Sequence, residues 1–359
     1  MNQMAIESAV INDLAERWQQ LLQRKGSIRI RNAADELGVS EAELLATRIG
    51  HSVVRLQGDF AQLMGDIKTL GPVMALTRND VVVHEKTGAY DKVSVHGHMG
   101  LALGVIDLRL FFNRFVYGFA VEEGTEQGIR RSLQFFAGNG EAVHKIYAVE
   151  GTDIAAFQAL VNRYWADDQR TGLSLQHEDI QPEPRWLATP TGIDKEQLHA
   201  DWCGLKDVHH FQAMLQRHGI ERIPAYQLVG EEFAQRLPVM AFEQVLITAA
   251  QRELSIMVFV GSQGVVQIHT GTVQTLKRTG PWFNVLDSDF NLHANTELID
   301  QVWLVRKPTT DGVVTALEMF DAQGRQVAQV FGERKPGKPE QTAWVQLLAD
   351  VQQSCELGA

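Results

Sequence analysis

Residues 132–147, SLQFFAGNGEAVHKIY, decide the fold because a related stretch, ALEMFDAQGRQVAQVF, occurs at residues 316–331. Each stretch reads as two apolar strands around a turn that contains glycine, which is the pattern of a β-hairpin. The alignment needs no gap and superposes three pairs along its length: Phe136 on Phe320, Gly140 on Gly324, and Lys145 on Gln329. The sequence therefore predicts one hairpin present in two copies.

Two shorter matches in the same order indicate that the repeat extends beyond this hairpin. They pair LLQRKG with MLQRHG, at residues 21–26 and 214–219, and DLRL with DFNL, at residues 107–110 and 289–292. The spacing is too long for a solenoid, so we interpret it as the duplication of one unit in which helices precede a sheet. In this alignment His209 falls opposite Glu16 and Arg109 falls opposite Asn291, so the repeated fold requires neither residue.

Length and composition restrict the class of protein. A chain of 359 residues exceeds what a single hydrophobic core usually serves, and 45% hydrophobic with 21% charged residues is typical of a globular protein. The formal net charge of −11 argues against a general nucleic-acid binder. No apolar run is long enough to cross a membrane, and the first residues lack the basic start of a signal peptide. The two cysteines are far apart, so we expect no disulfide framework, no thiolate zinc site and a cytoplasmic location.

The order of helical and strand patterns predicts an α+β fold. Residues 5–70 read mostly as helices, and short alternating runs typical of strands follow them. We expect an N-terminal repeat at residues 1–168, a polar and proline-containing linker at 169–194, and a C-terminal repeat at 195–359. Each repeat should consist of helices packed on a large antiparallel sheet.

The stretch LKDVHHFQAMLQRHG at residues 205–219 predicts an amphipathic helix with Asp207 as its N-cap and Gly219 as its stop. At 100° per residue, Phe211 and its apolar neighbours share one side, whereas His209 points almost the opposite way. The first turn of a helix disfavours a charged imidazole, and a metal ligand must be neutral. His209 is therefore a candidate ligand, although an exposed histidine on a helix is most often only solvated.

Two other candidates carry weaker signals. Arg109 and Phe111 should stand together on one side of an alternating strand, where an arginine is usually an ion-pair partner. His96 and His98 flank a glycine but have no carboxylate or cysteine at a recognised metal-ligand spacing, so we interpret them as structural or exposed. Hydrolase, zinc-protease, kinase, flavin and nicotinamide fingerprints do not occur.

Four motifs together resemble the HemS/ChuS/HmuS family of cytoplasmic haem-utilisation proteins. They are DLRLFFNRF, LKDVHHF, IMVFVGSQGVVQIHTG and RKPTTDGVVTALEMF, at residues 107–115, 205–211, 256–271 and 306–320. The resemblance implies that His209 is the proximal ligand of the haem iron, with Arg109 and Phe111 on the opposite face. It further implies that the pocket is lined by Arg222, Lys307 and Gln329. His210 stands where several relatives have glutamine, which leaves it open as an alternative iron ligand.

The resemblance also implies a fold and a function. We expect two homologous halves with one haem (iron protoporphyrin IX) in the cleft between them, and Arg222 and Lys307 as partners of the propionates. The protein would accept imported haem for trafficking, for oxidative degradation with iron release, or for both. Its partners would then include the haem importer, a haem oxygenase or an electron-donor reductase, and Arg109 would be catalytic if the protein is an enzyme. The alternative is a haem-free interaction protein that has kept the duplicated fold.

Overall fold

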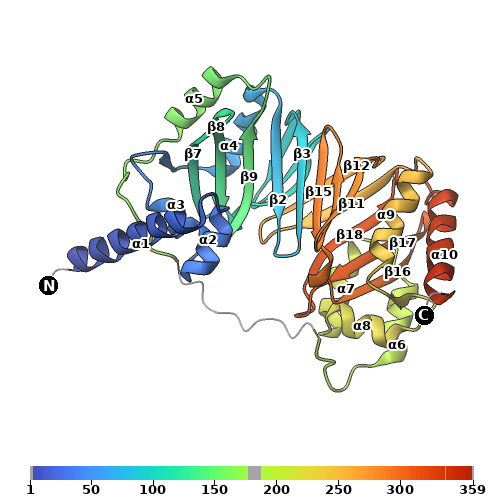
Figure 1. Ribbon diagram of the computed structural model, residues 1–359. Helices are drawn as coiled ribbons and strands as arrows, with labels where there is room; N and C mark the ends of the chain where they lie inside the picture. The colour runs from blue at the N-terminus through green and yellow to red at the C-terminus, as the bar shows by residue number, and fades with distance from the viewer. Residues whose placement is uncertain (1–2, 177–186, 336, 358–359) are drawn as a thin grey trace. The chain divides into compact units, whose positions relative to one another are not determined.

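The computed structural model describes residues 3–176, 187–335 and 337–357, so part of the expected linker lies outside the described residues. The chain forms two compact units. Unit 1 is made of Met1–Arg78, Glu85–Gln181 and Ser262–Gln267, and unit 2 of Asn79–His84, Pro182–Gly261 and Ile268–Ala359. Each unit therefore contains a short segment from the opposite half of the sequence. Both units combine helices with antiparallel strands, which confirms the predicted α+β fold (Figure 1).

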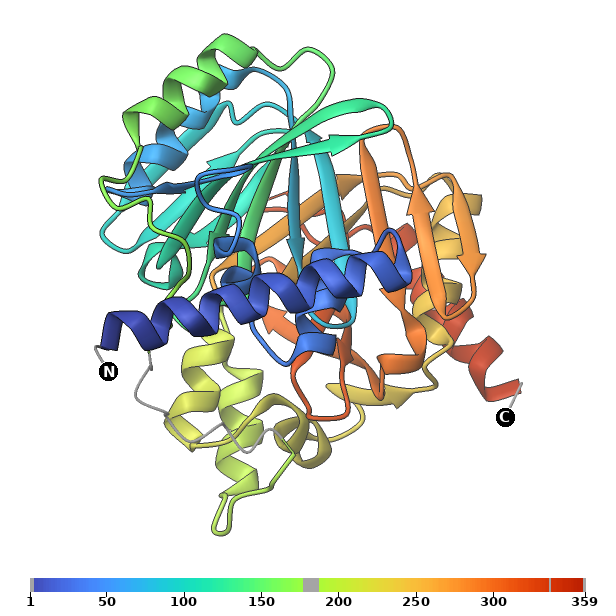
Figure 2. The ribbon, with the colours of Figure 1, turned by 60° about the vertical axis from the view of Figure 1, so that its left-hand side comes forward.

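In unit 1, the strands β1, β7, β8, β9 and β2 form one antiparallel ladder, and β4, β5 and β6 form another. Buried side chains of the five-stranded ladder pack with α4, η1 and α5 in one apolar cluster and with α3 in another. The long helix α1, dark blue in Figure 2, contacts α2 and α3. The elements are α1 (Gln3–Lys25), α2 (Ile30–Leu37), α3 (Glu41–Ala46), β1 (Val53–Leu56), α4 (Phe60–Asp66), η1 (Ile67–Leu70), β2 (Val73–Arg78), β4 (Lys92–His96), β5 (Met99–Leu103), β6 (Asp107–Phe111), η2 (Phe112–Arg114), β7 (Tyr117–Thr125), β8 (Gly128–Phe136), β9 (Ala142–Ala148) and α5 (Ile154–Arg163).

Unit 2 repeats this plan. Strands β10, β16, β17, β18 and β11 form the larger ladder and β13, β14 and β15 the smaller. Helices α9 and α10 lie side by side and share one apolar cluster with the larger ladder, whereas α6, α7 and α8 share another (Figure 1). The elements are α6 (Lys195–Cys203), α7 (His210–His218), α8 (Arg222–Val229), β10 (Ala234–Leu237), α9 (Ala241–Gln251), β11 (Ile256–Gly261), β13 (Leu276–Thr279), β14 (Trp282–Leu286), β15 (Phe290–Asn295), η3 (Thr296–Leu298), β16 (Gln301–Thr309), β17 (Gly312–Phe320), β18 (Gln326–Gly332) and α10 (Thr342–Leu357). Two further strands, β3 (Val82–Gly88) and β12 (Val265–Gly271), contribute residues to both units.

The duplicated hairpin is confirmed residue by residue. Gln134 pairs with Lys145 across β8 and β9, and Glu318 pairs with Gln329 across β17 and β18. Both ladders shift register at the same place, just before Phe136 and just before Phe320. The sequence Ser40-Glu41-Ala42-Glu43 also predicts a capping box, and the structure forms it: the Ser40 side chain accepts from the N–H of Glu43, whose side chain accepts from the N–H of Ser40. Strands β1 and β7 were not predicted, because they lie outside the runs in which apolar and polar residues alternate clearly.

The predicted match of LLQRKG with MLQRHG is wrong. Both α2 and α7 end at a left-handed glycine, Gly38 and Gly219, with the same pair of backbone hydrogen bonds, and each is followed by a second helix and a strand. Helix α7 is thus the counterpart of α2 rather than of α1. His209 falls opposite Ile28, not Glu16, and it still has no equivalent of its own chemistry in the other half.

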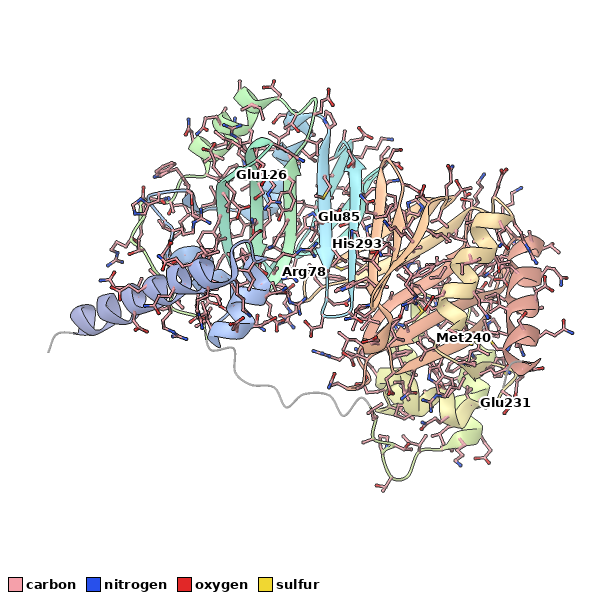
Figure 3. The ribbon with its side chains drawn as sticks, in the orientation of Figure 1. Arg78, Glu85, Glu126, Glu231, Met240 and His293 are labelled. Carbon is pink, nitrogen blue, oxygen red and sulfur yellow. The ribbon has the colours of Figure 1, made fainter. Side chains whose placement is uncertain are left out.

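The match of DLRL with DFNL is displaced by two residues. The N–H of Phe112 donates to His98 O at 2.8 Å, and the N–H of Thr296 donates to Pro281 O at 3.0 Å, each at the start of a 3-10 turn that follows the strand. This superposes Phe112 on Thr296, and therefore Arg109 on His293, which Figure 3 labels on β15. The predicted alignment of Arg109 with Asn291 is wrong. It relied on four similar residues and not on the turn that follows each strand.

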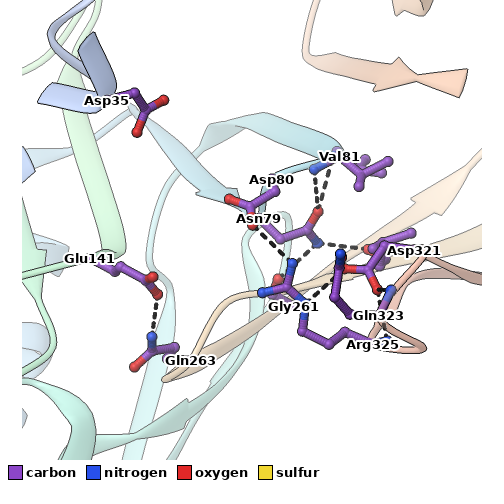
Figure 4. A network of polar contacts seen from close by, with 12 residues as sticks. Asp35, Asn79, Asp80, Val81, Glu141, Gly261, Gln263, Asp321, Gln323 and Arg325 are labelled. Carbon is purple, nitrogen blue, oxygen red and sulfur yellow. Dashed lines mark hydrogen bonds and ion pairs between the residues drawn. The ribbon is translucent and has the colours of Figure 1, made fainter. Parts of the chain in front are cut away.

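A polar side chain anchors each of the short segments that come from the opposite half of the sequence, Asn79–His84 in unit 2 and Ser262–Gln267 in unit 1. In unit 2, the Asn79 amide donates to Gly261 O at 3.1 Å and to Val327 O at 2.8 Å, while its oxygen accepts from the N–H of Val81 and Val82 (Figure 4). In unit 1, Ser262 Oγ donates to Val143 O at 2.7 Å. Val143 and Val327 hold equivalent positions in the duplicated hairpin, so the two anchors follow the same plan.

Candidate functional site

His209 lies in the turn that leads into α7. The N–H of His210 donates to Asp207 O at 3.1 Å and the N–H of Phe211 donates to Val208 O at 3.2 Å, which makes this turn tighter than an α-helix. Phe211 is 1% exposed, whereas the His209 side chain is 85% exposed. The predicted separation of His209 from the apolar side of the helix is therefore confirmed.

Asp207 binds His209 twice. The N-cap residue of α7 is His209 and not Asp207 as predicted; Asp207 instead caps the preceding turn, because its Oδ1 accepts from the backbone N–H of His209 at 2.8 Å and from the imidazole Nδ1 at 2.6 Å. The hydrogen bond from the backbone N–H, followed by that from the imidazole, holds the pKa of Asp207 below its usual value. In the neutral tautomer that donates Nδ1–H to the carboxylate, Nε2 carries the lone pair, and Nε2 has no hydrogen-bond partner among the described residues. A carboxylate on the far nitrogen is the usual orienting group of a metal-binding histidine.

His210 is also exposed and lies in the same turn. Successive side chains on a helix point about 100° apart, so His209 and His210 present their imidazoles in different directions. Of the two imidazoles, that of His209 is hydrogen-bonded to the Asp207 carboxylate, whereas His210 contacts Asp207 through its backbone N–H. Orientation by a carboxylate thus distinguishes the two histidines.

The two expected propionate partners lie in a buried polar cluster of unit 2. Lys307 on β16 is 4% exposed, and its Nζ donates to Glu318 Oε1 at 2.5 Å. Arg222 opens α8, and its Nη1 lies 3.5 Å from Glu318 Oε2. Gln329 is half-buried and lies opposite Glu318 on the neighbouring strand. The structure brings these three predicted residues together around Glu318, which the sequence did not single out.

The charges of this cluster compensate one another. Burial alone would raise the pKa of Glu318, but the adjacent Lys307 and Arg222 outweigh burial and hold that pKa below its usual value. Burial likewise lowers the pKa of Lys307, and the carboxylate opposes this effect. Two cations against one carboxylate leave one net positive charge available to an anionic ligand.

Arg109 and Phe111 lie on β6 of unit 1, and both are partly exposed. Register places Leu101 opposite Arg109 and Met99 opposite Phe111, so all four side chains share one face of the smaller ladder. Arg109 forms an ion pair with Asp107 and donates to Leu108 O at 3.3 Å. Met99 is 54% exposed. The face thus combines a cation with apolar side chains, and Met99 and Leu101 were not identified from the sequence because their strand alternates weakly.

His96 pairs with Met99 across β4 and β5 and joins the same face, whereas His98 lies in the turn between these strands. Among the described residues, no group of three or more His, Cys, Asp or Glu side chains is arranged to hold a metal ion. None of the described helices is both long and apolar enough to span a membrane.

Comparisons with known proteins cover nearly all of the chain. The family described as the haemin-degrading HemS.ChuX domain matches residues 38–164 and 219–351, so both matches begin at the glycine that ends α2 or α7. The hemin transport protein HmuS of Yersinia pestis is 38% identical over 89% of this chain and 91% of its own length. The hemin transport protein HemS of Yersinia enterocolitica is 39% identical over 88% of this chain and 90% of its own length.

Solved structures agree with the sequence comparisons. Holo-PhuS, a heme-binding protein from Pseudomonas aeruginosa, is 43% identical with a TM-score of 0.88, covering 94% of this chain and 98% of its own. ChuS, described as an E. coli heme oxygenase, is 35% identical with a TM-score of 0.84, covering 94% and 99%. The matches in both halves and the extent of these similarities show that the chain belongs to the haemin-degrading HemS.ChuX domain family, and with it to the HemS/ChuS/HmuS group.

Proposed function

We propose that this protein binds one haem through His209 and serves haem uptake and iron acquisition. The observation that carries the proposal is the exposed imidazole of His209, whose Nδ1 is bonded to Asp207 and whose Nε2 is left for a metal. One imidazole is sufficient for haem because the porphyrin supplies four of the ligands of the iron. Relatives named as hemin transport, heme-binding and heme oxygenase proteins support this assignment.

The remaining predicted residues supply the other groups that haem requires. Arg109 and Phe111, with Met99 and Leu101 on the same face, would meet the side of the porphyrin away from His209. Arg222, Lys307 and Gln329 would lie toward the propionates, where the net positive charge of their cluster attracts carboxylates.

We further propose that the protein works in the cytoplasm, where it receives haem from the importer. It then passes the haem to a haem oxygenase or takes part in opening the ring and releasing the iron. Bound haem would supply the redox chemistry in the second case, with electrons from an external reductase. Arg109 would then be the catalytic residue, since it brings a positive charge to the open face of the porphyrin.

Titration of the purified protein with haemin tests the binding proposal. We expect a Soret band that saturates at one equivalent and a changed ferric spectrum in His209→Ala. Substitution of His51, an exposed histidine in unit 1, should leave the spectrum unchanged and serves as the matched control. An unchanged spectrum in His209→Ala with a changed one in His210→Ala would assign the iron to His210. Absence of a saturable band would favour the haem-free interaction protein.

A second experiment separates degradation from transport. The haem complex is mixed with a reductant in the presence of catalase, which removes free peroxide. Loss of the Soret band together with a linear tetrapyrrole product would establish degradation, and Arg109→Ala should slow it. Recovery of intact haem on an added haem oxygenase would instead establish a carrier.

A further inference from the structure

Glu318 on β17 is 0% exposed and lies at the centre of the buried cluster. Besides Lys307 and Arg222, its carboxylate accepts from the Tyr226 hydroxyl at 2.6 Å and from the Gln326 amide at 2.5 Å. A carboxylate removed from water persists only when such partners compensate the loss of hydration. The negative charge of Glu318 therefore holds each of these hydrogen-bond and ion-pair partners in place.

The cations that Glu318 holds also contact α7. The ring of Phe211 has Lys307 Nζ at 4.3 Å and Arg222 Cζ at 5.1 Å from its centroid, which is the geometry of cation–π contacts. Arg222 Nη2 also donates to Gln212 Oε1 at 3.3 Å. Phe211 and Gln212 belong to the first turn of α7, directly after His209 and His210.

We infer that Glu318 is a positioning residue for the His209 ligand and acts through Lys307 and Arg222. The charge of buried Lys307 depends on the carboxylate, because burial alone favours the neutral amine. Without Glu318, Lys307 would lose its charge or move away from the ring of Phe211. The first turn of α7 would then lose the contacts that hold it. The inference rests on the proposed function in that the positioned group is taken to be the iron ligand.

Unit 1 provides a matched cluster. Glu41 at the start of α3 is 6% exposed, and it forms ion pairs with Lys145 on β9 and with Arg78 at 2.5 Å (Arg78 is labelled in Figure 3). Glu41 occupies the position in α3 that Arg222 occupies in α8, because Gly38 corresponds to Gly219. Glu41→Gln therefore removes the central carboxylate of the corresponding buried cluster in unit 1 without touching α7.

The first test uses the protein without haem and measures amide hydrogen exchange. In Glu318→Gln, the amides of His210 and Phe211 should exchange about tenfold faster than in the wild type, while those of α3 remain unchanged. Tyr226→Phe, which removes one hydrogen bond to the carboxylate, should show a smaller change at the same amides. In Glu41→Gln these amides should keep the wild-type rate. Uniform acceleration along the chain in Glu318→Gln, or none in α7, would overturn the inference.

The second test records the ferric spectrum and the rate of haem loss after loading with haemin. Glu318→Gln should give more than one ferric species and about tenfold faster loss of haem, whereas Glu41→Gln should match the wild type. A wild-type protein that binds no haem would refute the proposed function, and the hydrogen-exchange result would still decide whether Glu318 orders α7. Normal binding by the wild type together with an unchanged spectrum in Glu318→Gln would refute the positioning role alone.

Discussion

Replacement of Asp207 should separate two effects that the structure combines in one carboxylate. Asp207→Asn keeps an oxygen that can accept from the backbone N–H of His209 but removes the charge that faces Nδ1. Asp207→Ala removes both interactions. Loss of a capping hydrogen bond at the start of a helix costs about 1 kcal/mol, and loss of a carboxylate behind a metal-binding histidine typically lowers metal affinity 10- to 100-fold.

The two variants therefore have different expected profiles. Asp207→Ala should lower the free energy of unfolding of the haem-free protein by about 1 kcal/mol, and Asp207→Asn by only a few tenths. Both should release haem at least about tenfold faster than the wild type, as measured by transfer to excess apomyoglobin. Because the pKa of Asp207 is depressed, its stabilising effect is present above the pKa of the unfolded chain and is lost as the pH falls through the folded value. Wild-type haem release in both variants would refute the orienting role of Asp207.

Three further predictions concern stability and are measured by urea unfolding. Burial lowers the pKa of His144 to about 3, so stability should fall as the pH drops below about 6.5, by up to roughly 1.4 kcal/mol per pH unit. Lys145→Met leaves the buried carboxylate of Glu41 with one cation fewer and should cost about 3–5 kcal/mol. Gly140→Ala should cost more than the 1–2 kcal/mol or so of a left-handed alanine, since Gly140 has φ +80° and its new methyl group would overlap the Ser40 side chain.

Controls for these predictions come from the same unit. His144→Gln should abolish most of the pH dependence between pH 6.5 and 4, and a persistent slope would assign it to other groups. Gly50 has φ +84° with open space around it, so Gly50→Ala reports backbone strain alone. Equal losses in Gly50→Ala and Gly140→Ala would show that the contact with Ser40 has no energetic consequence.

Local patterns were sufficient for much of the fold. The capping box at Ser40 and the duplicated hairpin were predicted correctly because each depends on residues close together in the chain. The alignment of the two repeats at α7 was predicted wrongly. It relied on six similar residues and not on the glycine that ends both α2 and α7. The hydrogen bonds at Gly38 and Gly219, and the helix and strand that follow each glycine, show which helices correspond.

The site shows the same limit. The exposure of His209 follows from helical periodicity, and its contact with Asp207 follows from a spacing of two residues. The role of Glu318 could not be predicted, because a glutamate in an apolar strand looks like an ordinary surface residue until the partners from α8 and β16 are known. The short segments that each unit takes from the opposite half of the sequence were not predicted for a related reason. Pairing between strands that are distant in the chain does not change the local sequence pattern.

The two buried carboxylate clusters have opposite polarity, and this has a consequence for assembly of the chain. In unit 1 the helix carries the carboxylate of Glu41 and the sheet carries Lys145, whereas in unit 2 the helix carries Arg222 and the sheet carries Glu318. A helix docked on the sheet of the other repeat would bury Glu41 beside Glu318 with Lys307 as their shared cation, or Arg222 beside Lys145 and Arg78 without a carboxylate, at a cost of several kcal/mol. Mispairing of similar repeats is a common folding error. The reversed charges would therefore favour docking of each helix on the sheet of its own repeat.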